Sequence, residues 1–260
     1  RYVKIHFFLP RVSLVILIYC QSISQCLANR FNAPEPSLMT PPSRSPSRSR
    51  QFSLFDRLIN HADDALRTIA GTHTENLRDN PVGNEAEAEL SIEEKTHSAG
   101  LMRINHTGEV CAQALYQGQA LTARLPRVRK SMEVAAKEEE DHLAWCENRL
   151  QELDSHTSLF NPIWYAMSFG IGAAAGIAGD RWSLGFVEET EIQVCAHLNE
   201  HLAQLPTQDV RSKKILTQMH KDEAKHALMA KSAGAATLPK PIKKLMASVS
   251  KVMTTTAYKL

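Results

Sequence analysis

The chain has 260 residues, of which 43% are hydrophobic and 22% are charged, a composition typical of a globular protein with a sizeable core. Its formal net charge of +2 is too small to indicate a nucleic-acid partner, and no long basic run is interleaved with aromatic residues. The five cysteines form no CxxC pair, so neither a disulfide framework nor a zinc ribbon is predicted.

Residues 1–52 differ in kind from the rest of the chain. An apolar run, "VSLVILIYC", is followed by the tract "PPSRSPSRSR". The run is short for a transmembrane helix. Three interpretations stay open, namely a secretory signal, an Arg- and Ser-rich transit peptide, and an over-extended reading frame. We expect this leader to be disordered and to lie outside the folded core.

Helical patterns begin at residue 53. The segment "SLFDRLINHADDALRTIAG" carries an apolar stripe and ends at Gly71, a residue that commonly stops a helix. The stripe consists of Leu54, Leu58, Ala62, Ala65, Leu66 and Ile69.

Four longer helical segments follow, and prolines separate them. Their expected ranges are 98–124, 127–154, 182–204 and 207–233. No window shows the β-branched alternation of a strand. The sequence therefore predicts an all-α fold.

The second long segment sets Glu139 and His142 three residues apart. On a helix these residues share one face, with Cβ atoms about 5–6 Å apart. A single such pair also arises by chance in a charged surface helix. The spacing recurs in the fourth segment as Glu223 and His226, and two copies on two helices indicate a shared cation site.

A four-helix site for two metal ions needs one more glutamate from each of the other two helices. Glu109 is the single acid of "INHTGEVCAQALYQGQA", where an unpaired buried carboxylate would be costly. The third segment offers several glutamates. Glu109 precedes Glu139 by 30 residues, and Glu191 precedes Glu223 by 32. Because Glu188 would give 35, we choose Glu191 and keep Glu188 as the alternative.

The chemistry of this set indicates the metal. Four carboxylates balance two divalent cations, and two neutral imidazoles complete the coordination. Oxygen and nitrogen ligands without thiolate favour iron or manganese over structural zinc. We expect two iron ions per subunit, because iron changes oxidation state in chemistry with dioxygen. The predicted ligands are Glu109, Glu139, His142, Glu191, Glu223 and His226.

Five motifs in this part of the chain are those of a known family. They are "RINHTGE" (103–109), "YQGQ" (116–119), "EEEDHL" (138–143), "ETEIQVCAHL" (189–198) and "DEAKHA" (222–227). Over residues 52–260 the chain resembles the membrane-associated di-iron hydroxylases of ubiquinone biosynthesis, which act on demethoxyubiquinol. The family's metal ligands fall on the same six residues, and His197 matches a further family histidine. Asn105 stands where animal members have Asp, a feature of the bacterial type.

The resemblance implies a ferritin-like four-helix bundle over residues 53–238, with an additional apolar, membrane-associating helix. It implies a monooxygenase, a 3-demethoxyubiquinol 3-hydroxylase, that places one oxygen atom of dioxygen on the ring of a polyprenylated demethoxyubiquinol. His197 is a candidate for delivering protons or electrons, or makes a simple core hydrogen bond. No G-x-G-x-x-G follows a strand, and the quinol itself is a candidate reductant.

The implied partners are the polyprenylated quinol, dioxygen, a membrane surface and accessory ubiquinone-biosynthesis proteins. The implied location is peripheral, on the cytoplasmic face of the bacterial inner membrane. The matrix face of the mitochondrial inner membrane is the alternative.

Two stretches suit an enzyme whose substrate lives in a bilayer. Residues 162–179 are uncharged and would form a helix of about 27 Å, slightly short of a span of about 20 residues. This helix either dips into one leaflet or caps the bundle. Residues 239–260 form a basic amphipathic helix that lies on anionic lipid or docks on the bundle. Its apolar face consists of Ile242, Leu245, Met246, Val249, Val252 and Met253.

Two rival functions stay open, an iron-storage or peroxide-scavenging protein on the same four-helix site, and a lipid-binding module whose E-x-x-H pairs are surface salt bridges.

Three single residues also carry predictions. His106 either hydrogen-bonds a ligand carboxylate or caps its helix. Gly108 and Gly118 are expected to permit close helix approach.

Overall fold

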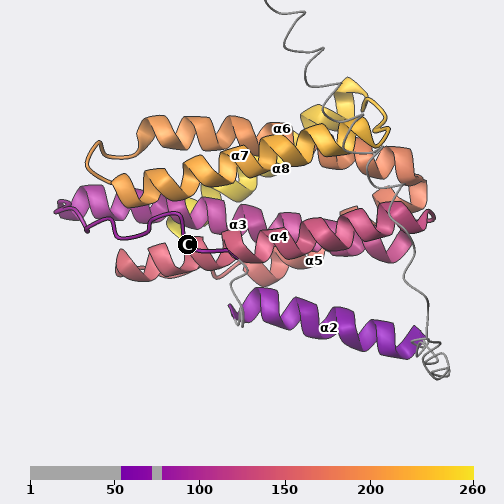
Figure 1. Ribbon diagram of the computed structural model, residues 1–260, viewed down its shortest axis with the longest axis horizontal. Coiled ribbons are helices and arrows are strands. Elements are labelled where there is room, and N and C mark those ends of the chain that lie inside the picture. The colour runs from indigo at the N-terminus through magenta and orange to yellow at the C-terminus, as the bar shows by residue number, and fades with distance from the viewer. Residues whose placement is uncertain (1–53, 72–77) are drawn as a thin grey trace, which may run out of the picture. The chain divides into compact units, whose positions relative to one another are not determined.

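The computed structural model describes residues 54–71 and 78–260 (Figure 1). The predictions for residues 1–52 lie outside the described residues. Within the described part the chain forms seven helices and no strand, which confirms the all-α prediction. The helices are α2 (Leu54–Ala70), α3 (Ile92–Thr122), α4 (Pro126–Glu152), α5 (Asn161–Ala178), α6 (Asp180–Gln204), α7 (Val210–Ser232) and α8 (Lys240–Lys259).

Helix α2 stops where predicted, because Gly71 has a φ of +67°, the left-handed conformation that glycine adopts after a helix end. The predicted stripe members Leu54 and Leu58 lie outside the described side chains, and over the remaining positions the buried side of α2 is narrower than predicted. Ile69 packs against the core, but Leu66 is 66% exposed, so its prediction is wrong. Thr68 is buried instead, and its hydroxyl donates a hydrogen bond of 2.6 Å to Gln113 Oε1 of α3. This polar contact fixes which face of α2 meets α3.

Helix α3 begins six residues before the predicted start at 98. The Ser91 hydroxyl accepts a hydrogen bond from Glu94 N, and the Glu94 carboxylate accepts one from Ser91 N. This reciprocal capping satisfies the free amides of the first turn. Helix α7 begins at Val210, three residues after its predicted start, where the Asp209 carboxylate accepts a hydrogen bond of 3.0 Å from Ser212 N.

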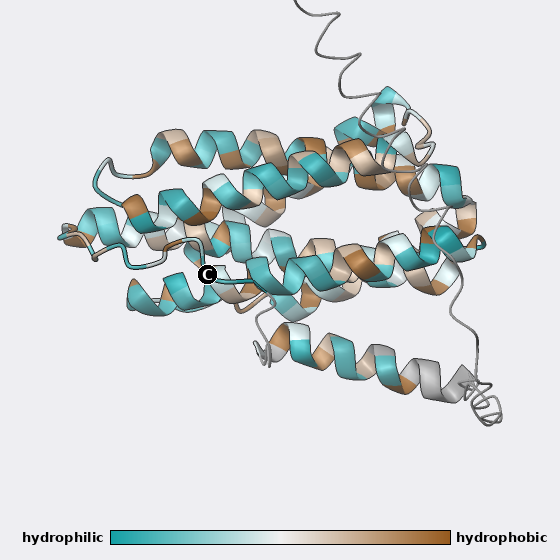
Figure 2. Cartoon of the chain, in the orientation of Figure 1, coloured by the Kyte–Doolittle hydropathy of each residue, from teal (hydrophilic) through white to brown (hydrophobic). Residues whose placement is uncertain are grey.

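The long helices pack in pairs, α3 against α4 and α6 against α7, and α4 also contacts α7 (Figure 1). Hydrophilic and hydrophobic residues alternate along α6 and α7 in Figure 2, as expected for helices with one face in a core. The largest core cluster takes side chains from all four helices, including Met102, Trp145, Leu198, Ile215 and Met219. Two helix pairs are thus held together by one core.

Helix α5 packs closely along α3 through glycines. A Cβ at Gly118 would lie 2.8 Å from Ala173 N, and one at Gly172 would lie 3.0 Å from Leu115 C. Such distances exclude any side chain unless the backbones move apart. The prediction for Gly118 is confirmed. The prediction for Gly108 is wrong, because an added Cβ there meets nothing within 4 Å.

Helix α8 docks on α3 and α6. Met253 and Ala257 are buried, and Met253 packs with Ile104 of α3. Leu245 and Val252 of the predicted apolar face remain 64% and 57% exposed. Among the helices of the described residues, none has the length and hydrophobicity needed to cross a membrane.

Candidate metal centre

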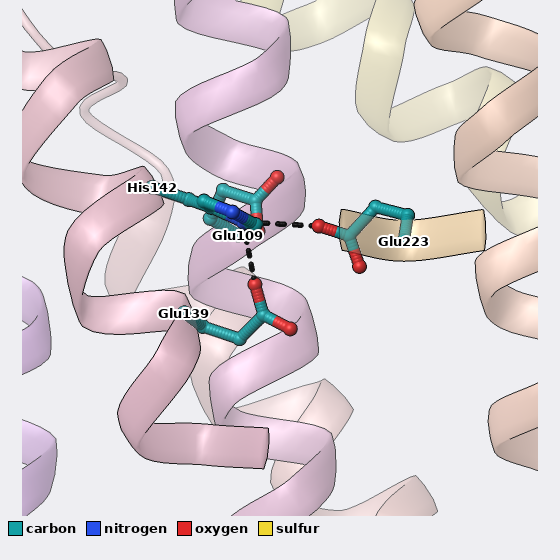
Figure 3. A group of neighbouring side chains, drawn as sticks. All are labelled: Glu109, Glu139, His142 and Glu223. Carbon is teal, nitrogen blue, oxygen red and sulfur yellow. Dashed lines mark hydrogen bonds and ion pairs between the residues drawn. The ribbon is translucent and has the colours of Figure 1, made fainter. Parts of the chain in front are cut away.

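Four predicted ligands meet in the interior. Glu109 of α3, Glu139 and His142 of α4, and Glu223 of α7 each turn one ligand atom toward the others, and these atoms all lie within 4.8 Å (Figure 3). All four residues are buried. The alternative in which the E-x-x-H pairs are surface salt bridges is therefore wrong.

Two of the carboxylates lie between the two histidines. Glu139 Oε2 is 2.8 Å from His142 Nδ1 and Glu139 Oε1 is 3.3 Å from His226 Nδ1. Glu223 Oε1 is 2.9 Å from His142 Nδ1 and Glu223 Oε2 is 3.1 Å from His226 Nδ1. Each of these glutamates thus directs one oxygen to each imidazole, which is the disposition that a carboxylate shared by two cations requires.

Glu191 of α6 lies beside this group. It is buried, and its Oε1 accepts a hydrogen bond from the Tyr116 hydroxyl. Glu188 instead keeps 20% of its side chain exposed and lies 3.8 Å from Lys231 Nζ. The geometry therefore favours Glu191 over Glu188 as a residue of the centre.

The charges of the group are strongly perturbed. Burial and repulsion from Glu139 raise the pKa of Glu109 well above its usual value. Burial and repulsion from Glu223 do the same to the pKa of Glu191. Burial alone would lower the pKa of His142, but its hydrogen bonds, chiefly those with nearby carboxylates, raise that pKa well above its usual value. Within the predicted ligand set, the positive charge that balances these carboxylates is therefore a protonated histidine.

The donor atoms suit a bound cation. Glu191 Oε2 is buried and accepts no hydrogen bond within the described residues. A buried carboxylate oxygen left in this way is costly, and a cation would satisfy it. The set of carboxylate oxygens and imidazole nitrogens fits iron or manganese. The residues present therefore fit the predicted metal.

The outer nitrogens of the two histidines bind carboxylates in a crossed manner. His142 Nε2 of α4 lies 3.1 Å from Asp222 Oδ2 of α7, and His226 Nε2 of α7 lies 2.6 Å from Glu138 Oε2 of α4. Such outer carboxylates fix the orientation of a ligating imidazole. Neither contact was predicted, although the sequence holds a signal for both, since an acidic residue precedes the glutamate in each E-x-x-H.

Arg78 lies on the outer side of His142. Its Nε donates a hydrogen bond of 2.7 Å to Asp141 Oδ2, and its Nη1 donates one of 2.7 Å to Asp222 Oδ2. Its Nη2 is 3.2 Å from His142 Nε2, and its guanidinium carbon is 4.8 Å from the centroid of the Trp145 ring. A single arginine before a helix carries no sequence signal for this position.

A cavity of about 470 Å³ lies between α3, α5, α6 and α8, and Glu109 forms part of its wall. Most of the wall is apolar, including Leu115, Trp164, Phe186 and Met246. The cavity therefore connects the carboxylate group to a space suited to an apolar molecule.

Histidines line part of this wall. His197 lies on the cavity and not in the Glu/His group, and its ring stacks on His201 with a centroid distance of 6.4 Å. His201 Nδ1 is 3.1 Å from Asn105 Oδ1. His106 lies in the middle of α3, and its Nδ1 atom is 3.4 Å from Asn161 Nδ2. The capping interpretation of His106 is therefore wrong.

Comparison with known proteins gives consistent matches. Residues 96–257 match the family described as "Ubiquinone biosynthesis protein COQ7". The chain is 58% identical over 211 residues to the 3-demethoxyubiquinol 3-hydroxylase of Acinetobacter baumannii, covering 81% of this chain and 100% of that protein. It is 59% identical over 211 residues to the protein of the same name from Stutzerimonas stutzeri, covering 81% and 98%.

Proposed function

Since the chain belongs to the COQ7 family of ubiquinone biosynthesis proteins, we infer that it hydroxylates the ring of demethoxyubiquinol, the activity that its bacterial relatives are named for. It is an oxidoreductase of ubiquinone biosynthesis, with a quinol and dioxygen as substrates. One observation carries this inference, namely that Glu109 belongs both to the buried Glu/His group and to the wall of an apolar cavity.

The proposed metal centre holds two iron ions on a ferritin-like bundle of α3, α4, α6 and α7. When bound, the iron pair supplies the redox chemistry that activates dioxygen. Glu139 and Glu223, which lie between the two histidines, would help to hold the iron pair. The full proposed ligand set is Glu109, Glu139, His142, Glu191, Glu223 and His226.

The chain's own residues then bind and orient the substrate. The cavity volume of about 470 Å³ lies in the range of small-molecule sites and accommodates a quinol ring with the first part of its tail. Apolar side chains such as Leu115 and Phe186 exclude water from the ring. Glu109 belongs to both the cavity wall and the Glu/His group, so the reacting carbon would lie near it.

We propose that His197 handles a proton of the quinol through a ring nitrogen. It stands on the cavity wall, where it can reach a bound hydroxyl group. Burial and the neighbouring His197 lower the pKa of His201 to about 4, so His201 is neutral at pH 7 where its ring stacks on that of His197. Asn105 holds His201 in place.

We also propose peripheral membrane association, on the cytoplasmic face of the bacterial inner membrane, or the matrix face in a mitochondrion. Exposed apolar side chains of α5 and α8, among them Ile163, Ile177, Leu245 and Val252, support it. Helix α8 carries five lysines; Lys243 pairs with Glu189, and the other four would meet anionic lipid. Accessory biosynthetic proteins are a further expectation. The iron-storage alternative has less support, since storage needs no apolar cavity beside the centre.

The test combines metal content with oxygen labelling. Glu139→Ala and Glu223→Ala should each lose most of the bound iron, whereas Glu188→Ala should keep about two ions per chain, because Glu188 lies outside the centre. With reductant, wild type should place one atom of labelled dioxygen on demethoxyubiquinol. Label that enters from water, or unchanged iron in both Ala variants, would refute the proposal.

A further inference from the structure

Arg78 joins two helices directly outside one histidine of the centre. It precedes α3, yet its guanidinium binds Asp141 of α4 and Asp222 of α7, each at 2.7 Å. The Asp141 side chain is only 2% exposed and that of Asp222 17% exposed. The Arg78 side chain is 37% exposed, but because both carboxylates are largely buried, these ion pairs are less screened by solvent than pairs between two exposed side chains, and the planar fork of arginine sets the angle between both carboxylates.

Asp222 is the carboxylate that orients His142. Its Oδ2 lies 3.1 Å from His142 Nε2 and also accepts the hydrogen bond from Arg78 Nη1. The same guanidinium covers Trp145, whose ring lies 5.3 Å from the His142 ring. Arg78 thus contacts the imidazole directly, with Nη2 3.2 Å from His142 Nε2, and restrains it further through its hydrogen-bond partner and through the ring beside it.

The other histidine has no such support. His226 Nε2 binds Glu138, whose side chain is 35% exposed. Among the arginines and lysines whose side chains the structure describes, none forms an ion pair with Glu138. The two halves of the centre, alike in their inner ligands, therefore differ in their outer contacts.

We propose that Arg78 is a positioning residue that fixes the His142–Asp222 pair and makes the two metal positions unequal. This inference rests on the proposed metal centre. Without Arg78, Asp222 keeps its hydrogen bond from Gln218 but loses the group that holds Oδ2 against the imidazole. His142 would then lose its fixed orientation, whereas His226 would keep its own.

Metal titration of the full chain tests the proposal, with Co²⁺ as the probe because its visible bands report coordination. Wild type should bind two ions. Arg78→Gln should bind one ion unchanged and the other about 10- to 100-fold more weakly, the usual cost of removing an outer partner of a ligand. The matched control is Arg211→Gln, because Arg211 also bridges two carboxylates, Glu87 and Glu152, away from the centre.

Arg78→Lys separates charge from geometry. Lysine keeps the charge but lacks the fork, so we expect it to restore the weakened ion only in part. Two unchanged affinities in Arg78→Gln, the same loss in Arg211→Gln, or full rescue by Arg78→Lys would each overturn the positioning role. A wild-type chain that binds no metal would instead refute the metal centre itself, so the two failures are distinguishable.

Discussion

Replacing Gly172 by alanine tests the close packing of α5 on α3. A Cβ at Gly172 meets the Leu115 backbone, whose carbonyl carbon would lie at 3.0 Å. Backbone atoms cannot rotate away, so the helices must separate. Gly170, two residues earlier on the same helix, is the matched control, since a Cβ there meets nothing within 4 Å.

The magnitude follows from two opposing effects. Glycine to alanine inside a helix stabilises by up to about 1 kcal/mol, and this gain is common to both variants. Overpacking costs about 1–3 kcal/mol and applies to Gly172→Ala only. The two variants should therefore differ by about 1–3 kcal/mol in the free energy of unfolding, with Gly170→Ala the more stable.

Urea denaturation measures this difference, provided that both variants share one m-value. Thermal unfolding should show the same order, with about 2–4 °C per kcal/mol for a domain of this size. Equal stabilities for the two variants would refute the close packing of α5 on α3.

Three further results are expected. Burial would lower the pKa of His226, but hydrogen bonds with Glu139 and other carboxylates raise it to about 12, and the pKa of His142 is also raised. Because a metal ion binds only neutral imidazole, metal binding at pH 7 should release at least two protons per chain. The affinity for metal should therefore rise with pH. Calorimetry in buffers of different ionisation enthalpy measures this, and zero release would contradict it. Burial raises the pKa of the Cys146 thiol well above its usual value, so peptide mass spectrometry after iodoacetamide at pH 8 should find Cys146 unlabelled in folded protein; rapid labelling would be inconsistent with that burial. Thr68→Val should cost about 1–3 kcal/mol in urea unfolding by leaving a buried amide oxygen unpaired, and an unchanged midpoint would argue against that hydrogen bond.

The inner residues of the centre could be predicted because their signal is local. Glu139 and His142 share a helix face whatever the rest of the chain does, and the repeated spacing selected Glu191, which is buried, over Glu188. The all-α class followed in the same way from periodicity. Local geometry was sufficient for these features.

The outer contacts depend on which helices are neighbours and how each is rotated, and no periodicity encodes this. The position of Arg78 beside His142 could not be predicted, because a lone arginine before a helix forms no recognisable motif. Thr68, rather than Leu66, faces the core because Gln113 of α3 offers it a partner. The early start of α3 was missed for another reason, since Ile92 is 82% exposed and its first turn shows no apolar face. There the capping residues, not hydrophobicity, mark the boundary.

The crossed outer contacts of α4 and α7 have the pattern of an isologous interface, in which residue i of one copy meets residue j of the other and j meets i. Glu138 corresponds to Asp222, and His142 to His226, by their places in the two E-x-x-H segments. Each acid meets the histidine of the opposite helix. The two helix pairs thus meet as two copies of one unit would across a two-fold axis. In each helix pair taken alone, the histidine lacks its outer carboxylate, because the other pair provides it. The histidines of both pairs therefore acquire their outer contacts only when α4 and α7 pack together.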